Sequence, residues 1–112
     1  AITTTGNTLL PETRKEIEEA WGCKVFDSYS CEGNSCVFEC PTHTCYHSTE
    51  EYGISEVVDE QGNPVKKGVG RLVSTSLWNM AQPFIRYDTQ DFVEVDDTPC
   101  ECGREHLKIV RI

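Results

Sequence analysis

Cysteine and histidine gather in two widely separated stretches of this 112-residue chain. The later stretch reads Cys100-Glu101-Cys102-Gly103-Arg104, in which two thiols flank one residue and a glycine follows. Such a knuckle supplies two ligands, whereas a closed zinc site needs four nitrogen or sulfur donors. The earlier stretch, residues 40–47, is the only other one rich in thiol and imidazole, with two cysteines and two histidines. The pattern predicts a structural metal site that ties the two stretches together, and it leaves the two earlier ligands open.

The overall charge and hydropathy narrow the classes of partner. The chain carries 10 basic and 19 acidic residues, a net charge of −9. Binding to a nucleic-acid backbone needs clustered Lys and Arg, so we expect no nucleic-acid partner. No apolar run approaches the roughly 20 residues of a membrane span, and residues 1–6 lack the pattern of a signal peptide. We therefore expect a cytoplasmic protein with no membrane association.

Seven cysteines are many for a chain of this length. In a secreted protein they would indicate a disulfide framework. The odd number, the absence of an export signal and the closeness of Cys100 to Cys102 favour reduced thiols with a metal site. A small secreted disulfide domain and thiols that merely pack are the alternatives.

The first third of the chain predicts strand, helix and strand. Residues 1–5 are rich in β-branched residues and favour a strand, and Pro11 and Gly22 are typical of a helix start and end. Between them an apolar stripe recurs at helical spacing, and two i,i+4 pairs are expected on the solvent face. The stripe consists of Ile17, Ala20 and Trp21, and the pairs are Arg14–Glu18 and Lys15–Glu19.

The remainder predicts short strands separated by turn signals. The expected strands are 24–29, 35–40, 54–59, 71–76, 84–87, 92–95 and 107–112, with turns at 33–34, 61–64 and 67–70. This pattern indicates an α+β fold, a strand–helix–strand start followed by an antiparallel β-subdomain clipped by a structural zinc. Both ends read as strands without a closing turn, so we expect an internal piece of a longer protein.

Three stretches, taken in order, resemble adenylate-forming enzymes, specifically the phenylacetate–CoA ligase group with its deazaflavin-coenzyme and capsular-polysaccharide relatives. Residues 4–9, followed by Arg14, Ile17 and Glu18, are similar to the adenine-side loop and its helix. Residues 25–32 resemble the aromatic–Gly–x–Thr–Glu motif. Residues 81–91 resemble the segment that contains Ile-Arg-Tyr-Arg-Thr-Gly-Asp in that group. The order and spacing of these stretches make the resemblance more specific than any single motif.

The resemblance implies roles in binding a nucleotide. Glu32 is implied as a Mg²⁺ ligand, since Mg²⁺ prefers hard oxygen donors. Tyr29 offers a flat face to adenine, and Asp91 can accept hydrogen bonds from both ribose hydroxyls. Gly6 and Asn7 bring backbone and amide groups to the adenine edge. Each residue also has a simpler reading: Glu32 as a solvated turn residue, Tyr29 as a core aromatic and Asp91 as a turn cap.

The chain departs from the group at several of these positions. Ser30 replaces the glycine after the aromatic residue, and Cys31 replaces the threonine, whose hydroxyl is the better donor to phosphate. In the later motif Asp88 replaces a basic residue and Gln90 replaces a glycine. Arg86 is expected to pair with an acid or to touch a ligand. These changes predict a nucleotide site that is weakened or altered in substrate.

The resemblance also selects the metal ligands. In many members of this group a cysteine, a histidine and a Cys-x-Cys-Gly-Arg knuckle occur in this order, which implies zinc held by Cys40, His47, Cys100 and Cys102. Cys45 or His43 in place of His47 is the alternative. A closed four-ligand site would be structural. The remaining cysteines are expected to pack as small apolar residues; they are Cys23, Cys31 and Cys36.

The implied parent is an ATP-dependent acid–CoA ligase or related synthetase that activates a carboxylate as acyl-AMP, with Mg-ATP, CoA and a small carboxylic acid as ligands. Residues 1–32 would end its α/β part, and 33–112 would form a β-rich subdomain that packs on the remainder of the parent chain. The sequence has no phosphate loop ending in lysine and no match to a mobile C-terminal domain. We therefore expect the 112 residues alone to be inactive. The main rival is a non-enzymatic, zinc-stabilised interaction module.

Overall fold

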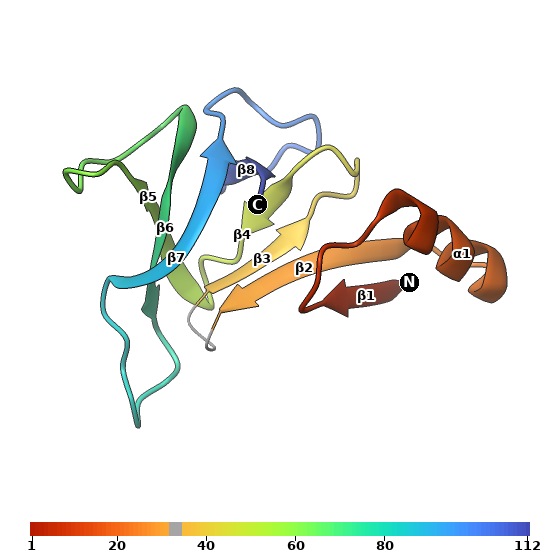
Figure 1. Ribbon diagram of the computed structural model, residues 1–112, viewed down its shortest axis with the longest axis horizontal. Coiled ribbons are helices and arrows are strands. Elements are labelled where there is room, and N and C mark those ends of the chain that lie inside the picture. The colour runs from red at the N-terminus through yellow and green to blue at the C-terminus, as the bar shows by residue number, and fades with distance from the viewer. Residues whose placement is uncertain (32–34) are drawn as a thin grey trace.

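A computed structural model describes residues 1–31 and 35–112 of the chain (Figure 1). The expected turn at 33–34 and Glu32, with its implied Mg²⁺ role, lie outside the described residues. The elements run in the order β1 (Ile2–Thr5), α1 (Pro11–Trp21), β2 (Val25–Cys31), β3 (Ser35–Glu39), β4 (Tyr46–Ser48), β5 (Gly53–Val58), β6 (Gly68–Ser76), β7 (Tyr87–Val95) and β8 (Lys108–Arg111).

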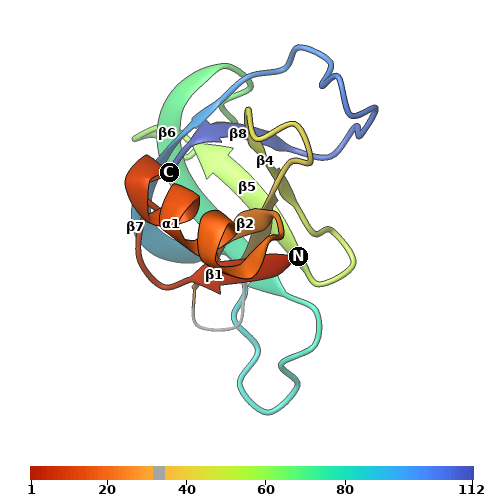
Figure 2. The ribbon, with the colours of Figure 1, turned by 90° about the vertical axis from the view of Figure 1, so that its right-hand side faces the viewer.

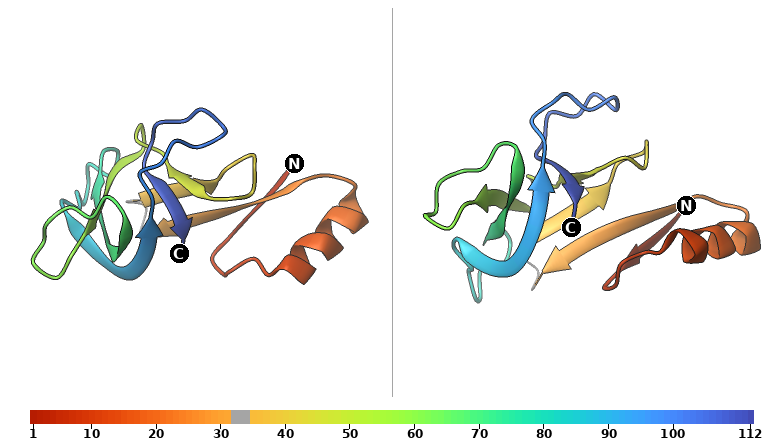
Figure 3. Two further views of the ribbon diagram at one scale, coloured as in Figure 1. Left: turned by 90° about the horizontal axis from the view of Figure 1, so that it is seen from above. Right: turned by 45° about the horizontal axis from the view of Figure 1, so that its top comes forward.

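The strands form one eight-stranded mixed sheet in the order β1-β2-β3-β4-β8-β7-β6-β5. β1 and β2 pair in parallel through the α1 crossover, and every other described pairing is antiparallel. This arrangement confirms a mostly β fold with one helix and a strand–helix–strand start. Figures 1 and 3 show that α1 lies at one end of the molecule, far from β5 and β6.

The sheet is curled, so that its two halves face each other. β3 contacts β5 and β6 as well as its neighbours in the sheet. Between the two halves lies the core, formed by Val37, Val57, Leu72, Val93, Val95 and Ile109. Gly70 permits the close approach of β6 to its neighbours, because an added Cβ would lie 2.7 Å from Cγ1 of Val57.

The expected helix is confirmed at both ends. Pro11 opens α1, and Gly22 closes it in the left-handed conformation, with φ of 61° and its N–H donating to the Glu18 carbonyl. The apolar stripe is not buried: no residue of α1, all of which the structure describes, is buried, and Trp21 is 73% exposed. The main packing contact of the helix is with β2, and in the end-on view of Figure 2 the helix stands in front of the strands.

The expected pair Arg14–Glu18 is also wrong, whereas Lys15 and Glu19 do pair, at 3.7 Å. Arg14 turns toward the sheet and binds Glu39 at 2.7 Å. Glu18 instead accepts a hydrogen bond from the backbone N–H of Val25. Both side chains therefore fix the helix to the strands rather than to itself.

Several strand boundaries differ from expectation. β4 was not expected, because three residues after a cysteine-rich turn give too short a pattern. Residues 68–70, expected in a turn, belong to β6. β7 contains the expected strand 92–95, but of the expected strand 84–87 it contains only Tyr87, and residues 84–86 precede it. β7 is irregular where its register against β6 shifts, and Gln90 there has φ of 65°. Among the described residues, no helix has the length and apolar composition needed to cross a bilayer.

Candidate metal centre and nucleotide cavity

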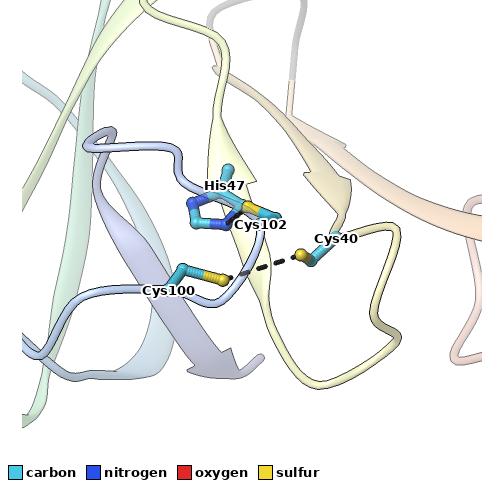
Figure 4. A group of neighbouring side chains, drawn as sticks. All are labelled: Cys40, His47, Cys100 and Cys102. Atoms are coloured by element: carbon cyan, nitrogen blue, oxygen red, sulfur yellow. Dashed lines mark hydrogen bonds between the residues drawn. The ribbon is translucent and has the colours of Figure 1, made fainter.

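Three neighbouring strands bring the two cysteine-rich stretches together. Cys40 directly follows β3, His47 is the central residue of β4, and Cys100 and Cys102 lie in the β7–β8 connection (Figure 4). In the sheet His47 lies opposite Phe38 on one side and Lys108 on the other. The short β4 therefore carries the histidine between the strand that precedes Cys40 and the strand that follows the knuckle.

Tight turns hold the thiols in place. The N–H of Cys40 donates to the Cys45 carbonyl at 2.7 Å, and that of His43 donates to the Cys40 carbonyl at 2.8 Å, which closes the loop at residues 40–45. In the knuckle, the N–H of Gly103 donates to the Cys100 carbonyl, and Gly103 has φ of 79°. A glycine takes this left-handed conformation without steric cost, so the position suits the residue.

The four donor atoms of Cys40, His47, Cys100 and Cys102 all lie within 4.8 Å of one another. The Cys40 and Cys100 sulfurs are 3.7 Å apart, and the Cys102 sulfur is 3.3 Å from Nε2 of His47 (Figure 4). Two thiolates bound to one zinc at 2.3 Å in a tetrahedron lie roughly 3.8 Å apart. The donor spacing therefore fits a zinc-sized tetrahedral ion.

Burial and hydrogen bonding make the same cluster suitable for a cation. Cys40 and His47 are almost fully buried, and Nδ1 of His47 has no hydrogen-bond partner among the described atoms. Burial raises the pKa of the Cys40 thiol, but hydrogen bonds from Thr42 and the neighbouring thiols outweigh it and lower the pKa to about 6. A buried thiolate needs a compensating cation, which a bound metal ion supplies.

The two alternative ligands differ sharply. Nδ1 of His43 lies 3.1 Å from both Arg14 and Glu39, and its ring stacks on Phe26, so it points away from the thiols. The sulfur of Cys45, by contrast, is 3.6 Å from both the Cys100 sulfur and Nε2 of His47. No disulfide joins any of the seven cysteines, all of which lie in the described part of the chain.

The residues implied in nucleotide contacts meet at a second place. Gly6, Asn7, Tyr29 and Asp91 all line one cavity of about 520 Å³, within the usual range for small-molecule sites. The cavity is lined by the segment after β1 and by residues of β2, β4, β7 and β8. A cavity of about 570 Å³ behind the knuckle is lined by none of these four residues.

Tyr29 and Asp91 contact each other inside this cavity. The Tyr29 hydroxyl donates to Oδ2 of Asp91 at 2.5 Å. Burial and this hydrogen bond raise the pKa of Tyr29. This hydrogen bond therefore fixes the orientation of the Tyr29 ring. It occupies Oδ2 of Asp91, so Oδ1 is the carboxylate oxygen that the tyrosine does not contact.

Asp27 was not among the predicted site residues, yet it lines the same cavity. Its carboxylate is buried and accepts hydrogen bonds from Thr4 and Tyr46, each at 3.0 Å. Asp27 stands two residues before Tyr29 on β2, so both share a face of the strand. That alternation is the signal that would have identified it.

Three residues of the segment 81–91, two of which differ from the phenylacetate–CoA ligase group, can be described individually. Asp88 binds Arg71 on β6 at 2.5 Å, so a neighbouring cation balances its charge. Arg86 pairs with Glu56 at 3.2 Å. Gln90, where the group has glycine, keeps a left-handed backbone with φ of 65°.

No model of a known protein family matches the chain. Phenylacetate-coenzyme A ligase of Thermus thermophilus is 34% identical over 105 residues, which cover 86% of this chain and 23% of that enzyme. The resemblance to the phenylacetate–CoA ligase group is confirmed. The chain spans about a quarter of the length of the proteins it matches.

Solved structures of 2-hydroxyisobutyryl-CoA ligase agree with this relationship. Its open conformation, in complex with 2-HIB-AMP and CoA, has a TM-score of 0.77 and 26% identity over 96% of this chain and 27% of the ligase chain. Its thioesterification state, with the same two ligands, has a TM-score of 0.72 and 27% identity over 91% of this chain and 23% of the ligase chain. The likeness therefore extends to the whole of the fold described here.

Proposed function

We propose that this chain is part of an AMP-forming acid–CoA ligase, in which it supplies one wall of the nucleotide site and a zinc-clipped β-subdomain. The observation that carries the proposal is the cavity shared by Gly6, Asn7, Tyr29 and Asp91. These residues come from motifs that are far apart in the sequence, and a chance resemblance gives no reason for them to line one cavity. The similarity to two acyl-CoA ligases supports the same proposal.

In this proposal the cavity binds the adenosine part of ATP and of the acyl-adenylate. The Tyr29 ring packs against adenine, Gly6 and Asn7 meet its edge, and Asp91 accepts hydrogen bonds from the ribose hydroxyls. Glu32 is proposed as the Mg²⁺ ligand. Such reactions depend on positioning and charge neutralisation of the phosphates, so these residues orient the nucleotide and carry out no proton transfer.

The proposed zinc ligands are Cys40, His47, Cys100 and Cys102. A shell of four protein ligands leaves no open position for water or substrate, so the ion has a structural role. It would hold the 40–47 stretch, which directly follows β3, against the connection between β7 and β8. Because Glu39 precedes Cys40 and binds Arg14, the ion also indirectly restrains helix α1.

For the whole parent protein we propose a cytoplasmic ligase that uses Mg-ATP, CoA and a small carboxylic acid. Residues 1–32 would end its α/β part and 33–112 would form the β-rich subdomain, with the remainder of the parent chain as the partner. The 112 residues carry no lysine-ended phosphate loop, so we expect them alone to bind nucleotide weakly and to be inactive. ATP–pyrophosphate exchange catalysed by these residues alone would contradict that expectation.

The test is a titration of the parent protein with ATP. Loss of a hydrogen bond to a charged group costs about 1.5–3 kcal/mol, so Asp91→Asn is expected to weaken ATP binding roughly 10- to 100-fold. Asp97→Asn is the control, since Asp97 is exposed and lies outside the nucleotide cavity. Equal affinity of the wild type and the Asp91 variant would refute the nucleotide role.

A non-enzymatic zinc-stabilised module is the second candidate. It is favoured by the Tyr29–Asp91 hydrogen bond, which occupies the carboxylate proposed for ribose, and by the replacements at Ser30, Cys31 and Gln90. A parent protein that binds zinc but neither binds ATP nor exchanges pyrophosphate would support this candidate over the ligase.

A further inference from the structure

A fifth possible donor lies next to the four-residue metal cluster. Beside the four donors of Cys40, His47, Cys100 and Cys102 lies the sulfur of Cys45, which is 4% exposed. Zinc in structural sites is almost always four-coordinate. One of the five donors is therefore left over when the other four bind.

Cys45 occupies the same side of the cluster as His47. The two residues stand two apart, with Cys45 directly before β4 and His47 at its centre, so both side chains point to one face. The Cys45 sulfur lies 3.6 Å from Nε2 of His47. Both donors can thus reach the same corner of a coordination shell without a change in the strand register.

The distance from Cys45 to the knuckle also matches a ligand position. Its sulfur lies 3.6 Å from the Cys100 sulfur, close to the 3.7 Å between Cys40 and Cys100. Both values approach the roughly 3.8 Å expected between two thiolates on one zinc. Cys23 and Cys36 also lie outside the four-residue group, but for neither of them does the structure describe a sulfur contact with it like those of Cys45.

We propose that Cys45 is a substitute ligand: it takes the coordination position of His47 when the imidazole is withdrawn, and the ion is then held by four thiolates. This inference rests on the zinc site of the proposed function. Three thiolates with one histidine and four thiolates are both established zinc shells, so either set retains the ion. The shell with His47 carries one negative charge fewer than the shell with Cys45.

The experiment replaces zinc with Co²⁺ in the protein and counts thiolate ligands by the sulfur-to-cobalt charge-transfer absorbance. Wild type and Cys45→Ser are expected to give the same absorbance of a three-thiolate site. His47→Ala is expected to bind one Co²⁺ with absorbance increased by about a third, because a fourth thiolate joins the shell. Cys23→Ser in the His47→Ala background is the control and should retain that increase.

The double variant His47→Ala with Cys45→Ser isolates the substitution. It should bind Co²⁺ more than about 100-fold more weakly than His47→Ala alone. Removal of an outer-shell partner weakens metal binding by roughly 10- to 100-fold, so a larger loss indicates a ligand. His47→Asn, which keeps a polar side chain near the ring position, repeats the comparison if His47→Ala does not fold.

The outcomes separate this inference from the metal proposal itself. If the wild type binds no Co²⁺, both are overturned. If the wild type binds Co²⁺ but neither His47 variant gains charge-transfer absorbance, only the role of Cys45 is overturned. If Cys45→Ser alone lowers the wild-type absorbance, Cys45 is the resident ligand and its role as a substitute is equally overturned.

Discussion

Nε2 of His47 lies 3.3 Å from the sulfur of Cys102, although 55 residues separate them in the sequence. The contact joins the centre of β4 to the connection between β7 and β8. These segments lie beside the junction of the two halves of the sheet, where β4 pairs with β8. An ion bound between them would stabilise that junction, at which Tyr46 pairs with Ile109 and His47 with Lys108.

Metal removal is therefore expected to lower the free energy of unfolding. At a free zinc concentration 1,000 times the Kd, binding stabilises the folded state by about 4 kcal/mol. Cys100→Ser should lose most of this amount, and a chelator should have the same effect on the wild type. Urea unfolding in buffered zinc, with and without chelator, measures the difference.

Cys23→Ser is the matched control for Cys100→Ser, since Cys23 is also half-buried but lies outside the cluster. It should keep the full response to zinc. An identical urea midpoint for the wild type before and after complete chelation would contradict the structural role of the ion.

The ion pair of Arg14 with Glu39 gives a second test. The Glu39 side chain is only 5% exposed and accepts hydrogen bonds from Arg14 and from the N–H of Asp27. Burial raises the pKa of Glu39, but these bonds and the charge of Arg14 keep it below its usual value. Arg14→Ala leaves a buried carboxylate without its cation, and we expect a loss of about 2–4 kcal/mol in unfolding free energy.

Lys15→Ala is the control on the adjacent position of the same helix. Lys15 and Glu19 form a pair with side chains 76% and 68% exposed, and such pairs contribute about 0–1 kcal/mol. Urea denaturation of both variants measures the contrast. Equal losses for the two would mean that the contacts of Glu39 with His43 and with the N–H of Asp27 suffice to stabilise the carboxylate.

The metal cluster shows how much of the candidate site could be predicted from the sequence. The knuckle, its glycine and the cysteine- and histidine-rich stretch identified the cluster, because ligand chemistry is restrictive. The choice of His47 over His43 or Cys45 could not be made from spacing. His43 is not in the cluster because its Nδ1 contacts Arg14 of α1 and Glu39 of β3, and these tertiary contacts leave no pattern in the spacing.

In the helix, the ends could be predicted from the sequence but the burial could not. Its ends follow from Pro11 and Gly22, which act locally, and they were predicted correctly. The burial of its apolar stripe depends on what packs against the helix, and in this chain Trp21 remains 73% exposed. β4 was missed for a similar reason, since three residues become a strand only through pairing with β3 and β8.

Gln90 provides a test of backbone strain. A left-handed backbone costs a non-glycine residue roughly 1–2 kcal/mol, and β-branched residues tolerate it least. We expect Gln90→Val to destabilise the protein by about 1–2 kcal/mol and Gln90→Gly to leave stability unchanged or improve it. Thermal unfolding measures both changes.

Gln82→Val is the control, because Gln82 is an exposed loop residue outside the left-handed region. It should change stability by less than about 0.5 kcal/mol, as surface substitutions usually do. If Gln90→Val were equally neutral, the left-handed conformation at Gln90 would not persist in solution.

The hydrogen bond from Tyr29 to Asp91 separates the two parts of the tyrosine side chain. In the proposed nucleotide site the ring packs on adenine, while the hydroxyl competes with ribose for the Asp91 carboxylate. Tyr29→Phe keeps the ring and releases the carboxylate, so ATP affinity should stay the same or increase up to about tenfold, because one hydrogen bond contributes about 0.5–1.5 kcal/mol net. Tyr29→Leu removes the ring, and affinity should fall roughly two- to tenfold, since aromatic stacking contributes about 0.5–1.5 kcal/mol. Calorimetric titration with ATP measures both. A tenfold loss in Tyr29→Phe would instead mean that the hydroxyl itself holds the nucleotide, and the assignment of Asp91 to ribose would then be wrong.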